Sequence, residues 1–435
     1  MSESRCCHLF LFILIILFLP VCAWGGVVPA KVIAKVGDIR PGADGYPISA
    51  INLAFTNGEG QLGFIGSVQR TTGSDAFVWY DDGFTWFNSN NALLSGAELD
   101  MGIGDDGRYI YSPSYDVNYD DAVWTHDGLL LVETDPSPGI AGMFVSFNSR
   151  PSMLPDGTAY WVAGLTSTEG GQSEGRVLYR SADTATPVIT TVIKSGDLIG
   201  GFTIDAPSGI GFDYMVSDND LHHIHDLTMD TGSSLNDEFI YVDGSLVVRE
   251  GSPASGGTGG ENWGTFDKVT INNAGTYLFS GDTDGDYTTD EYIAYNGTIS
   301  LREGQTVDGI ALATAATVNG LAINNRNQAV HLWTVGGGGK HLFFAKSAAN
   351  LGKSVRVLST GDMIDVNGDG VGDYTVTDLK SNISGMRYNA WLAEDGNLFV
   401  KVELSGGITP VDAIIRLSLP AGSVNPALPL LLLGN

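Results

Sequence analysis

Short apolar runs, typical of β-strands, alternate with turn residues along most of the chain in a repeated order. The first kind of run follows a tight turn of the form Asn-x-x-Gly-x-x-apolar-aromatic, seen most clearly at Asn57 and Asn272. Successive starts are separated by 47 to 69 residues, so the pattern predicts seven similar units. The five weaker copies start at Gly104, Leu154, Ser217, Asn324 and Ala393.

Two further runs complete each unit. The second is usually opened by an acidic residue and often closed by Asp-Gly or Asn-Gly, as at Asp243-Gly244 and Asn296-Gly297. Such pairs between apolar runs predict a tight β-hairpin, because both turn positions must accept a positive φ. The third run leads into a glycine-containing turn and is found at 34–38, 192–197, 247–252, 301–305 and 358–362.

The two ends of this repeat are complementary. The copy of the third run at 34–38 precedes any complete unit, whereas the last strand, Asp412 to Leu417, is a second run with no third run after it. We therefore expect an all-β fold, a β-propeller of seven blades over residues 24–420, with the N- and C-terminal strands sharing one blade. Six or eight blades, or another β architecture, remain alternatives. Separate β-sandwiches are disfavoured, because a sandwich typically needs about 100 residues.

The repeated Asn-x-x-Gly motif, alternating with a Gly-Asp turn, resembles bacterial exported proteins described as tandem-repeat NxxGxxAF-containing, choice-of-anchor proteins. The resemblance covers essentially the whole chain after its first 23 residues. It implies an exported, β-rich protein and no particular activity. Some of these relatives end in a membrane-sorting tail, but the apolar stretch Leu428 to Leu433 within the tail 421–435 is too short to span a bilayer and has no basic residue after it.

The N-terminal residues 1–23 have the pattern of a secretory signal peptide. Arg5 precedes an unbroken apolar segment from Leu9 to Leu19, and Val21-Cys22-Ala23 fits a cleavage site. Lipidation of Cys22 is the alternative. All three cysteines fall in this segment, so we expect a secreted, periplasmic or cell-surface protein without disulfides.

Composition supports a turn-rich, acidic protein. The 435 residues include 58 Gly and 50 Asp+Glu against 22 Lys+Arg, which gives a net charge of −28. Of the acids 37 are Asp, a residue of turns and caps, and only 13 are Glu. This charge argues against nucleic acid as a partner, since phosphate binding needs clustered Lys and Arg.

Two aspartate-rich loops share the pattern D-x-[DN]-G-D-x-x-x-D, at 282–290 and 365–373. Alternating oxygen ligands in a tight loop suit Ca²⁺, and we expect both loops to bind it. An EF-hand is excluded because position 12 is Ile293 or Val376 instead of Glu. The pattern resembles the calcium loops of integrin-type propeller repeats. The alternative is a solvated acidic turn. The predicted ligands are Asp282, Asp284, Asp286, Asp290, Asp365, Asn367, Asp369 and Asp373.

Two other groups of residues are weaker candidates for a site. In Leu221-His222-His223-Ile224-His225-Asp226, strand alternation places His223 and His225 on one face, where they could bind Zn²⁺ with a third ligand. We favour a structural role for them, because His223 occupies a repeat position. Five aromatic residues are candidates for a carbohydrate groove, but their repeat positions favour core packing. They are Trp79, Tyr80, Trp124, Tyr160 and Trp161.

No nucleophile elbow, Walker loop or dinucleotide-binding motif is present. We therefore expect a non-enzymatic, calcium-stabilised binding or cell-surface module whose partner is a carbohydrate or a protein. The alternatives are a secreted polysaccharide hydrolase or lyase with its site on one propeller face, and a structural envelope component.

Overall fold

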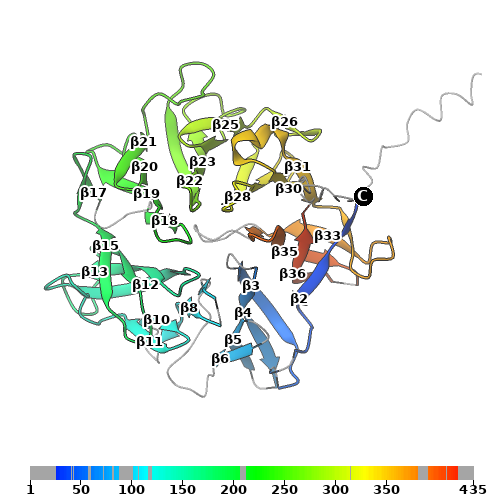
Figure 1. Ribbon diagram of the computed structural model, residues 1–435, viewed down its shortest axis with the longest axis horizontal. Coiled ribbons are helices and arrows are strands. Elements are labelled where there is room, and N and C mark those ends of the chain that lie inside the picture. The colour runs from blue at the N-terminus through cyan, green and yellow to red at the C-terminus, as the bar shows by residue number, and fades with distance from the viewer. Residues whose placement is uncertain are drawn as a thin grey trace, which may run out of the picture.

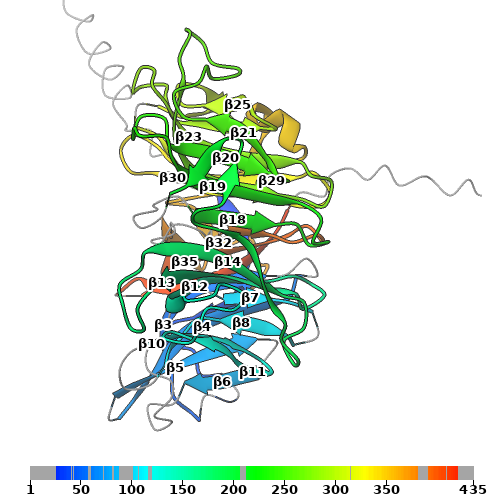
Figure 2. The same ribbon diagram turned by 90° about the vertical axis from the view of Figure 1, so that its left-hand side faces the viewer.

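Small antiparallel sheets stand around a common centre in the computed structural model (Figure 1). The described residues are 26–419 without 41, 43, 57–59, 72, 81–82, 88–100, 106, 116–119, 206–211, 314, 381–389 and 408. The predicted signal peptide (1–23) and C-terminal tail (421–435) lie outside them. The described residues form seven sheets of four or more strands, which confirms the seven-bladed propeller. Seen from the side (Figure 2), blades 3 and 4 stack one above the other.

Each blade is a meander of four main strands, innermost first. Blade 1 contains β3 (Ile48–Thr56), β4 (Leu62–Arg70), β5 (Gly73–Tyr80) and β6 (Gly83–Phe87). Blade 2 contains β7 (Met101–Ile103), β8 (Tyr109–Tyr111), β10 (Asp120–Thr125) and β11 (Gly128–Val132), with β9 (Ser114–Tyr115) also paired to β10. Blade 3 contains β12 (Phe144–Met153), β13 (Ala159–Thr166), β14 (Gly175–Ser181) and β15 (Ile189–Lys194). Blade 4 contains β18 (Phe212–Val216), β19 (His223–Asp230), β20 (Glu238–Val242) and β21 (Ser245–Arg249), and the hairpin of β16 (Leu198–Ile199) and β17 (Phe202–Ile204) extends it.

The second half of the ring repeats this plan. Blade 5 contains β22 (Trp263–Ile271), β23 (Tyr277–Thr283), β24 (Tyr292–Tyr295) and β25 (Thr298–Arg302). A hairpin of β26 (Thr306–Val307) and β27 (Ile310–Ala311) leads to blade 6. Blade 6 contains β28 (Thr317–Ile323), β29 (Ala329–Thr334), β30 (Lys340–Ala345) and β31 (Val355–Ser359), with the 3₁₀ helix η2 (Ala348–Lys353) between the last two.

Blade 7 is completed by both ends of the chain. Its inner strand is divided into β33 (Tyr374–Leu379) and β34 (Ala390–Leu392), which both pair with β35 (Asn397–Ser405). The last strand, β36 (Val411–Ser418), pairs antiparallel with β2 (Lys31–Lys35), which is the outermost strand (Figure 1). The predicted sharing of a blade by the terminal strands is therefore confirmed. In addition, β1 (Val27–Pro29) pairs parallel with β32 (Met363–Asp365).

The Asn-x-x-Gly turn joins the first two strands of every blade. Its fourth residue has a positive φ in all seven copies, between 58° and 87°. L-residues other than Gly, Asn and Asp rarely adopt this conformation. Where Asn holds the first position, as in Asn272, its Oδ1 accepts the N–H groups of Ala274 and Thr276 at 3.0 and 3.1 Å. The positive-φ residues are Gly60, Gly107, Gly157, Asp220, Gly275, Asn327 and Gly396.

The Gly-Asp turn ends the outer strands and ties them to the next blade. At 194–197, the Asp197 carboxylate accepts the N–H of Lys194 at 3.0 Å, and Gly196 has a φ of 86°. The N–H of Gly196 then bonds the carbonyl of Ile204, which belongs to the next blade. The sequence motif missed one copy, in blade 2, because Thr134 replaces the glycine at a φ of 74°. The signal that identifies this copy is Asp135, whose carboxylate accepts the N–H of Val132.

The hydrophobic core lies between blades. Among the described residues, seven clusters of buried apolar side chains each contain residues of two adjacent blades, including blades 7 and 1. In blades 5 and 6, for example, Leu301 packs with Trp333 in one such cluster. A single blade thus has no core of its own, and closure of the ring buries the last pair of faces. In the described part of the chain, no helix is long and apolar enough to cross a membrane.

Candidate functional site

The loop at 365–373, which begins at the last residue of β32, is closed by hydrogen bonds among its predicted calcium ligands and its backbone. Asn367 donates its side-chain amide to Asp373 Oδ1 at 3.2 Å, and Asp365 accepts the N–H groups of Gly368 and Gly370 at 2.7 and 2.8 Å. These backbone bonds lower the pKa of Asp365 below its ordinary value. The fourth ligand, Asp369, accepts the N–H of Val371. Asp365 Oδ1 already accepts two N–H groups, those of Asn367 and Gly368, but Asp365 Oδ2 and the carboxylates of Asp369 and Asp373 keep lone pairs that suit a hard cation.

The loop at 282–290 is arranged differently, because its four aspartates have different partners. Asp282 lies beside Glu291, Asp284 accepts from Asn262, and Asp286 accepts from the N–H of Thr288 at 3.0 Å. Asp290 lies beside Glu303. In the 365–373 loop a hydrogen bond thus joins two predicted ligands, Asn367 and Asp373, whereas the aspartates of the 282–290 loop each have a different neighbour. No group of three or more His, Cys, Asp or Glu side chains stands in metal-binding geometry among the described residues.

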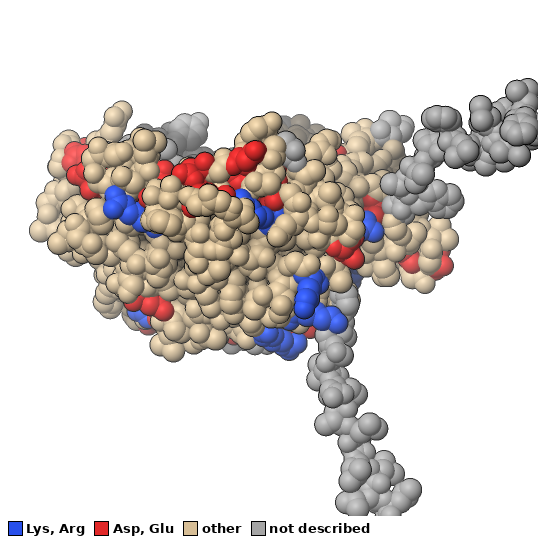
Figure 3. Space-filling view, turned by 90° about the horizontal axis from the view of Figure 1, so that it is seen from above, with Lys and Arg blue, Asp and Glu red and all other residues tan. Residues whose placement is uncertain are grey.

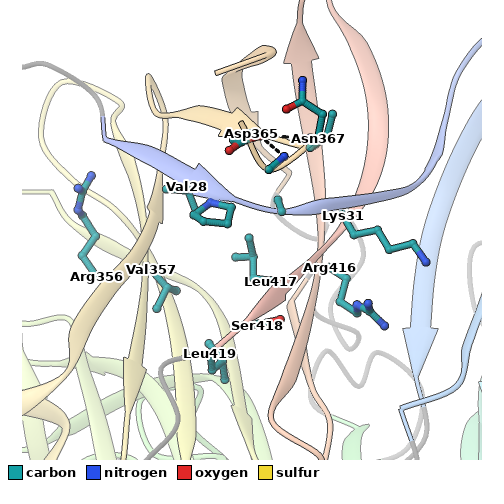
Figure 4. Close-up of a pocket in the computed structure, with 14 residues that line it drawn as sticks. Val28, Lys31, Arg356, Val357, Asp365, Asn367, Arg416, Leu417, Ser418 and Leu419 are labelled. Carbon is teal, nitrogen blue, oxygen red and sulfur yellow. Dashed lines mark hydrogen bonds between the residues drawn. The ribbon is translucent and has the colours of Figure 1, made fainter. Parts of the chain in front are cut away.

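A pocket of about 660 Å³ adjoins the 365–373 loop (Figure 4). We call it the closing-blade pocket, because the blade 7 elements β1, β2, β32 and β36 border it, together with β31 of blade 6. Lys31 and Arg416 face each other across the β2–β36 pairing, where two like charges are unfavourable without an anion. Arg356 is held by Asp362, with an Nη1–Oδ1 distance of 3.0 Å. Its apolar wall contains Val28, Val357, Leu417 and Leu419, and its polar wall contains Lys31, Arg356, Asp365, Asn367 and Arg416.

A second pocket, of about 600 Å³, lies between blades 3 and 4, and we call it the blade 3–4 pocket. One wall comes from β15 and β16 and the other from β19 and β20. His223 and His225 lie on the same face of β19, as predicted, with ring centroids 6.2 Å apart and planes 10° from parallel. The Tyr241 ring lies 5.5 Å from that of His225. Both imidazoles line this pocket.

Burial favours the neutral form of both histidines. Burial lowers the pKa of His225 to about 3 and lowers that of His223 below its ordinary value. His225 is 1% exposed. The Nδ1 atoms of both rings are buried without a hydrogen-bond partner. Asp226 does not join the pair, because alternation along β19 places it on the opposite face of the strand. There it lies beside Asp213 on β18.

The acids that open the third strand of a blade bind the next blade. Glu238 Oε2 accepts the N–H of Phe266 on β22 at 2.9 Å, and Glu291 Oε1 accepts the N–H of Val318 on β28 at 2.6 Å. Burial raises the pKa of Glu238 to about 7 and that of Glu291 to about 10. The repeat shows these acids in the sequence, but only their burial shows that they join blades.

Four of the five candidate aromatic residues are in the core. Trp79, Tyr80, Tyr160 and Trp161 are at most 6% exposed, which confirms core packing over a surface groove. Trp124 is half-buried beside the cluster between blades 1 and 2.

The sequence did not identify Tyr241 or Asp197 as pocket residues. Tyr241 lies on a different strand from the two histidines, and Asp197 follows the last strand of blade 3.

No family model matches the chain, and no curated protein matches it. Solved structures similar to the chain include propeller domains. The Cps50 (Swd1) β-propeller domain of Myceliophteria thermophila is 9% identical and covers 90% of this chain and 100% of its own, with a TM-score of 0.40. The Penicillium chrysogenum α-L-arabinanase complexed with arabinobiose is 12% identical and covers 90% and 98%, with a TM-score of 0.36. A Xanthomonas campestris gluconolactonase is 12% identical and covers 71% and 95%, with a TM-score of 0.31. These likenesses concern the fold alone.

Proposed function

We propose that the chain is a non-enzymatic binding module, exported to the cell surface or its surroundings and stabilised by Ca²⁺. The observation that carries the proposal is that the buried glutamates with raised pKa values lie outside the two pockets. The closing-blade and blade 3–4 pockets are open at blade junctions, whereas Glu238 and Glu291, whose pKa values are raised, line neither pocket and each bind the backbone of the next blade. These acids thus have a structural role, and the pockets offer space for a ligand.

Ca²⁺ would be held by Asp365, Asn367, Asp369 and Asp373, and in the first loop by Asp282, Asp284, Asp286 and Asp290. A bound ion supplies positive charge that offsets the repulsion of the loop carboxylates. The support is stronger for 365–373, where hydrogen bonds already join Asn367 to Asp373 and close the backbone around Asp365. This loop also borders the closing-blade pocket, so its order contributes to the pocket wall (Figure 4).

Calcium binding is tested by thermal unfolding of the intact chain. We expect the melting temperature to fall by several degrees in EDTA and to recover with CaCl₂ but not with MgCl₂, because bound ligand stabilises the folded state by mass action. The double variant Asp365→Asn/Asp373→Asn should lose most of this response. The matched control is Asp44→Asn/Asp308→Asn, which removes two charges outside both loops. An unchanged melting temperature in EDTA would remove Ca²⁺ from the proposal.

The binding role is tested by applying the intact chain to an array of surface polysaccharides and following both retention and product release. We expect retention without turnover. Turnover that is abolished by a single Asp→Asn change would overturn the non-enzymatic role and establish the hydrolase or lyase instead. Absence of both retention and turnover would contradict carbohydrate binding by this module.

A further inference from the structure

We propose that the blade 3–4 pocket binds one sugar unit of a neutral saccharide. The proposal rests on the binding function above and adds a place and a ligand class to it. At about 600 Å³ the pocket lies within the 300–1,000 Å³ that is usual for small-molecule sites. One wall combines β15 of blade 3 with β16 of the hairpin that extends blade 4, and the other comes from β19 and β20 of blade 4.

Hydrogen-bond donors come from the two imidazoles. A neutral imidazole carries one N–H and one acceptor nitrogen. The Nδ1 atoms of His223 and His225 are buried without an acceptor nearby, so we place the ring proton on Nε2 in both. The nitrogen that remains for a ligand is then an N–H donor in each ring. Two uncharged donors on one strand face suit ligand oxygens without requiring a negative charge.

Acceptors lie at the opening of the same pocket. Asp243 already accepts from His222 Nδ1 at 2.7 Å and from the backbone N–H of His223 at 2.8 Å, so its orientation is fixed. Asp197 is fixed by Lys194, whose backbone N–H and ammonium group each bind one of its carboxylate oxygens. Both carboxylates retain free lone pairs. A ligand group that can both accept from the imidazoles and donate to these carboxylates is a hydroxyl.

The rim of the pocket is apolar and exposed. Leu198, Leu221 and Val192 are 72%, 69% and 36% exposed, although each borders the pocket. Exposed apolar side chains that gather around a hollow commonly mark a binding surface. A sugar ring presents C–H groups on one face and hydroxyls at its edge, and it therefore matches an apolar rim around a polar floor.

Charge distinguishes this pocket from the closing-blade pocket. Its lining contains two aspartates and no Lys or Arg; the charge of Asp197 is offset by the Lys194 ammonium group, so Asp243 supplies the remaining negative charge of the lining. An anionic sugar would be repelled here, whereas the closing-blade pocket has three basic residues. A Zn²⁺ site is disfavoured as well, because the described residues add no third ligand to the two histidines. The pocket thus favours a neutral saccharide.

The test is isothermal titration of the intact chain with D-glucose, D-galactose and D-mannose, each compared with its uronic acid. We expect at least one neutral sugar to bind and its uronic acid to bind at least about fivefold more weakly. Leu221→Asp should weaken binding about tenfold. The control is Leu235→Asp, at a leucine that is 77% exposed and does not line the pocket, and it should leave affinity unchanged.

A second variant examines the donors directly. His225→Phe keeps a flat ring but removes both nitrogens, and it should also reduce affinity about tenfold in a protein that melts cooperatively; His341→Phe in blade 6 is its control. The proposal is overturned by a folded protein that binds none of the neutral sugars, by tighter binding of the uronic acid, or by Zn²⁺ binding alone. Sugar binding that neither Leu221→Asp nor His225→Phe affects would refute this pocket but leave the binding function intact. Failure on the polysaccharide array would remove both.

Discussion

At the scale of single residues, the repeat motif records a backbone requirement. The fourth residue of the Asn-x-x-Gly turn has a positive φ in every blade, and it is Gly, Asn or Asp in each copy. Asn327 and Asp220 show that the conformation is retained where glycine is absent. The degenerate copies of the turn are therefore equivalent in structure, because the backbone conformation repeats even where the amino acid differs.

This requirement predicts the effect of Gly275→Ala. Gly275 has a φ of 72°, and a Cβ there would lie 3.1 Å from the ring of His222. We expect a loss of about 1–2 kcal/mol in the free energy of unfolding. Gly275→Asn should cost less, because Asn tolerates this conformation. Urea unfolding measures both. The control Gly259→Ala, at a glycine with no atom within 4 Å of the added Cβ, should change little; an equal loss there would contradict the explanation.

At the scale of elements, the outermost strand of the last blade is supplied by the other end of the chain. Val32 pairs with Ile415 and Ala34 with Ile414 across the β2–β36 ladder. Ala34 is fully buried in the cluster that joins blades 7 and 1. The strand therefore both covers an exposed sheet edge and closes the ring of cores.

A charge in this strand is expected to open the ring. Ala34→Glu places an unpaired carboxylate in the cluster between blades 7 and 1, where an uncompensated buried charge costs about 3–5 kcal/mol. Lys31→Glu is the control, because Lys31 lies exposed on the same strand. Urea unfolding should show a large loss for the first variant and a small change for the second. A loss below about 0.5 kcal/mol for Ala34→Glu would show that closure does not depend on β2.

At the scale of the whole molecule, charge is distributed unevenly. On the side shown in Figure 3, acidic side chains gather toward the upper rim of the disc and a group of basic side chains lies at the lower rim. Much of the acidity is located in turns, as in Asp197 and Asp243, and part of it is buried between blades, as in Glu291. Part of the acidity behind the net charge of −28 thus has a structural use, and the charge by itself does not identify a basic partner.

Buried histidines and glutamates give opposite pH dependences of stability. Burial lowers the pKa of His225 and His331 to about 3 from 6.5, so the unfolded chain binds their protons first and stability is lost as the pH falls below 6.5. Burial raises the pKa of Glu238 to about 7 and of Glu291 to about 10 from 4.5, so stability is lost as the pH rises above 4.5.

Between pH 4.5 and 6.5 these four groups offset one another, so we expect a plateau there, with a decline on both sides. Urea unfolding from pH 3.5 to 9.5 measures the profile. Glu291→Gln retains an oxygen for the Val318 N–H but cannot ionise, and it should flatten the alkaline decline. A free energy of unfolding that rises steadily over the whole range would contradict this assignment.

Much of the fold could be predicted from the sequence, because the propeller is built from local signals. Turns that require a positive φ and short apolar runs mark each blade, as at Asn272 and at Asn296-Gly297, whose two residues have φ values of 47° and 80°. The complementary ends at 34–38 and 412–417 predicted the shared blade. Local backbone preference and strand order are properties of neighbouring residues, which a sequence displays directly.

Only the tertiary structure decided where the pockets lie and which acids bind a neighbouring blade. His225 becomes part of a pocket because Asp197 of the segment after β15 and Tyr241 of β20 are brought beside it. Glu291 acts between blades because Val318, 27 positions away, presents an N–H to it. Pocket shape, burial and pKa depend on distances between residues that are remote in the chain. The sequence by itself determined how each blade is made and how the ring closes; the packing of blade against blade determined where a ligand can bind.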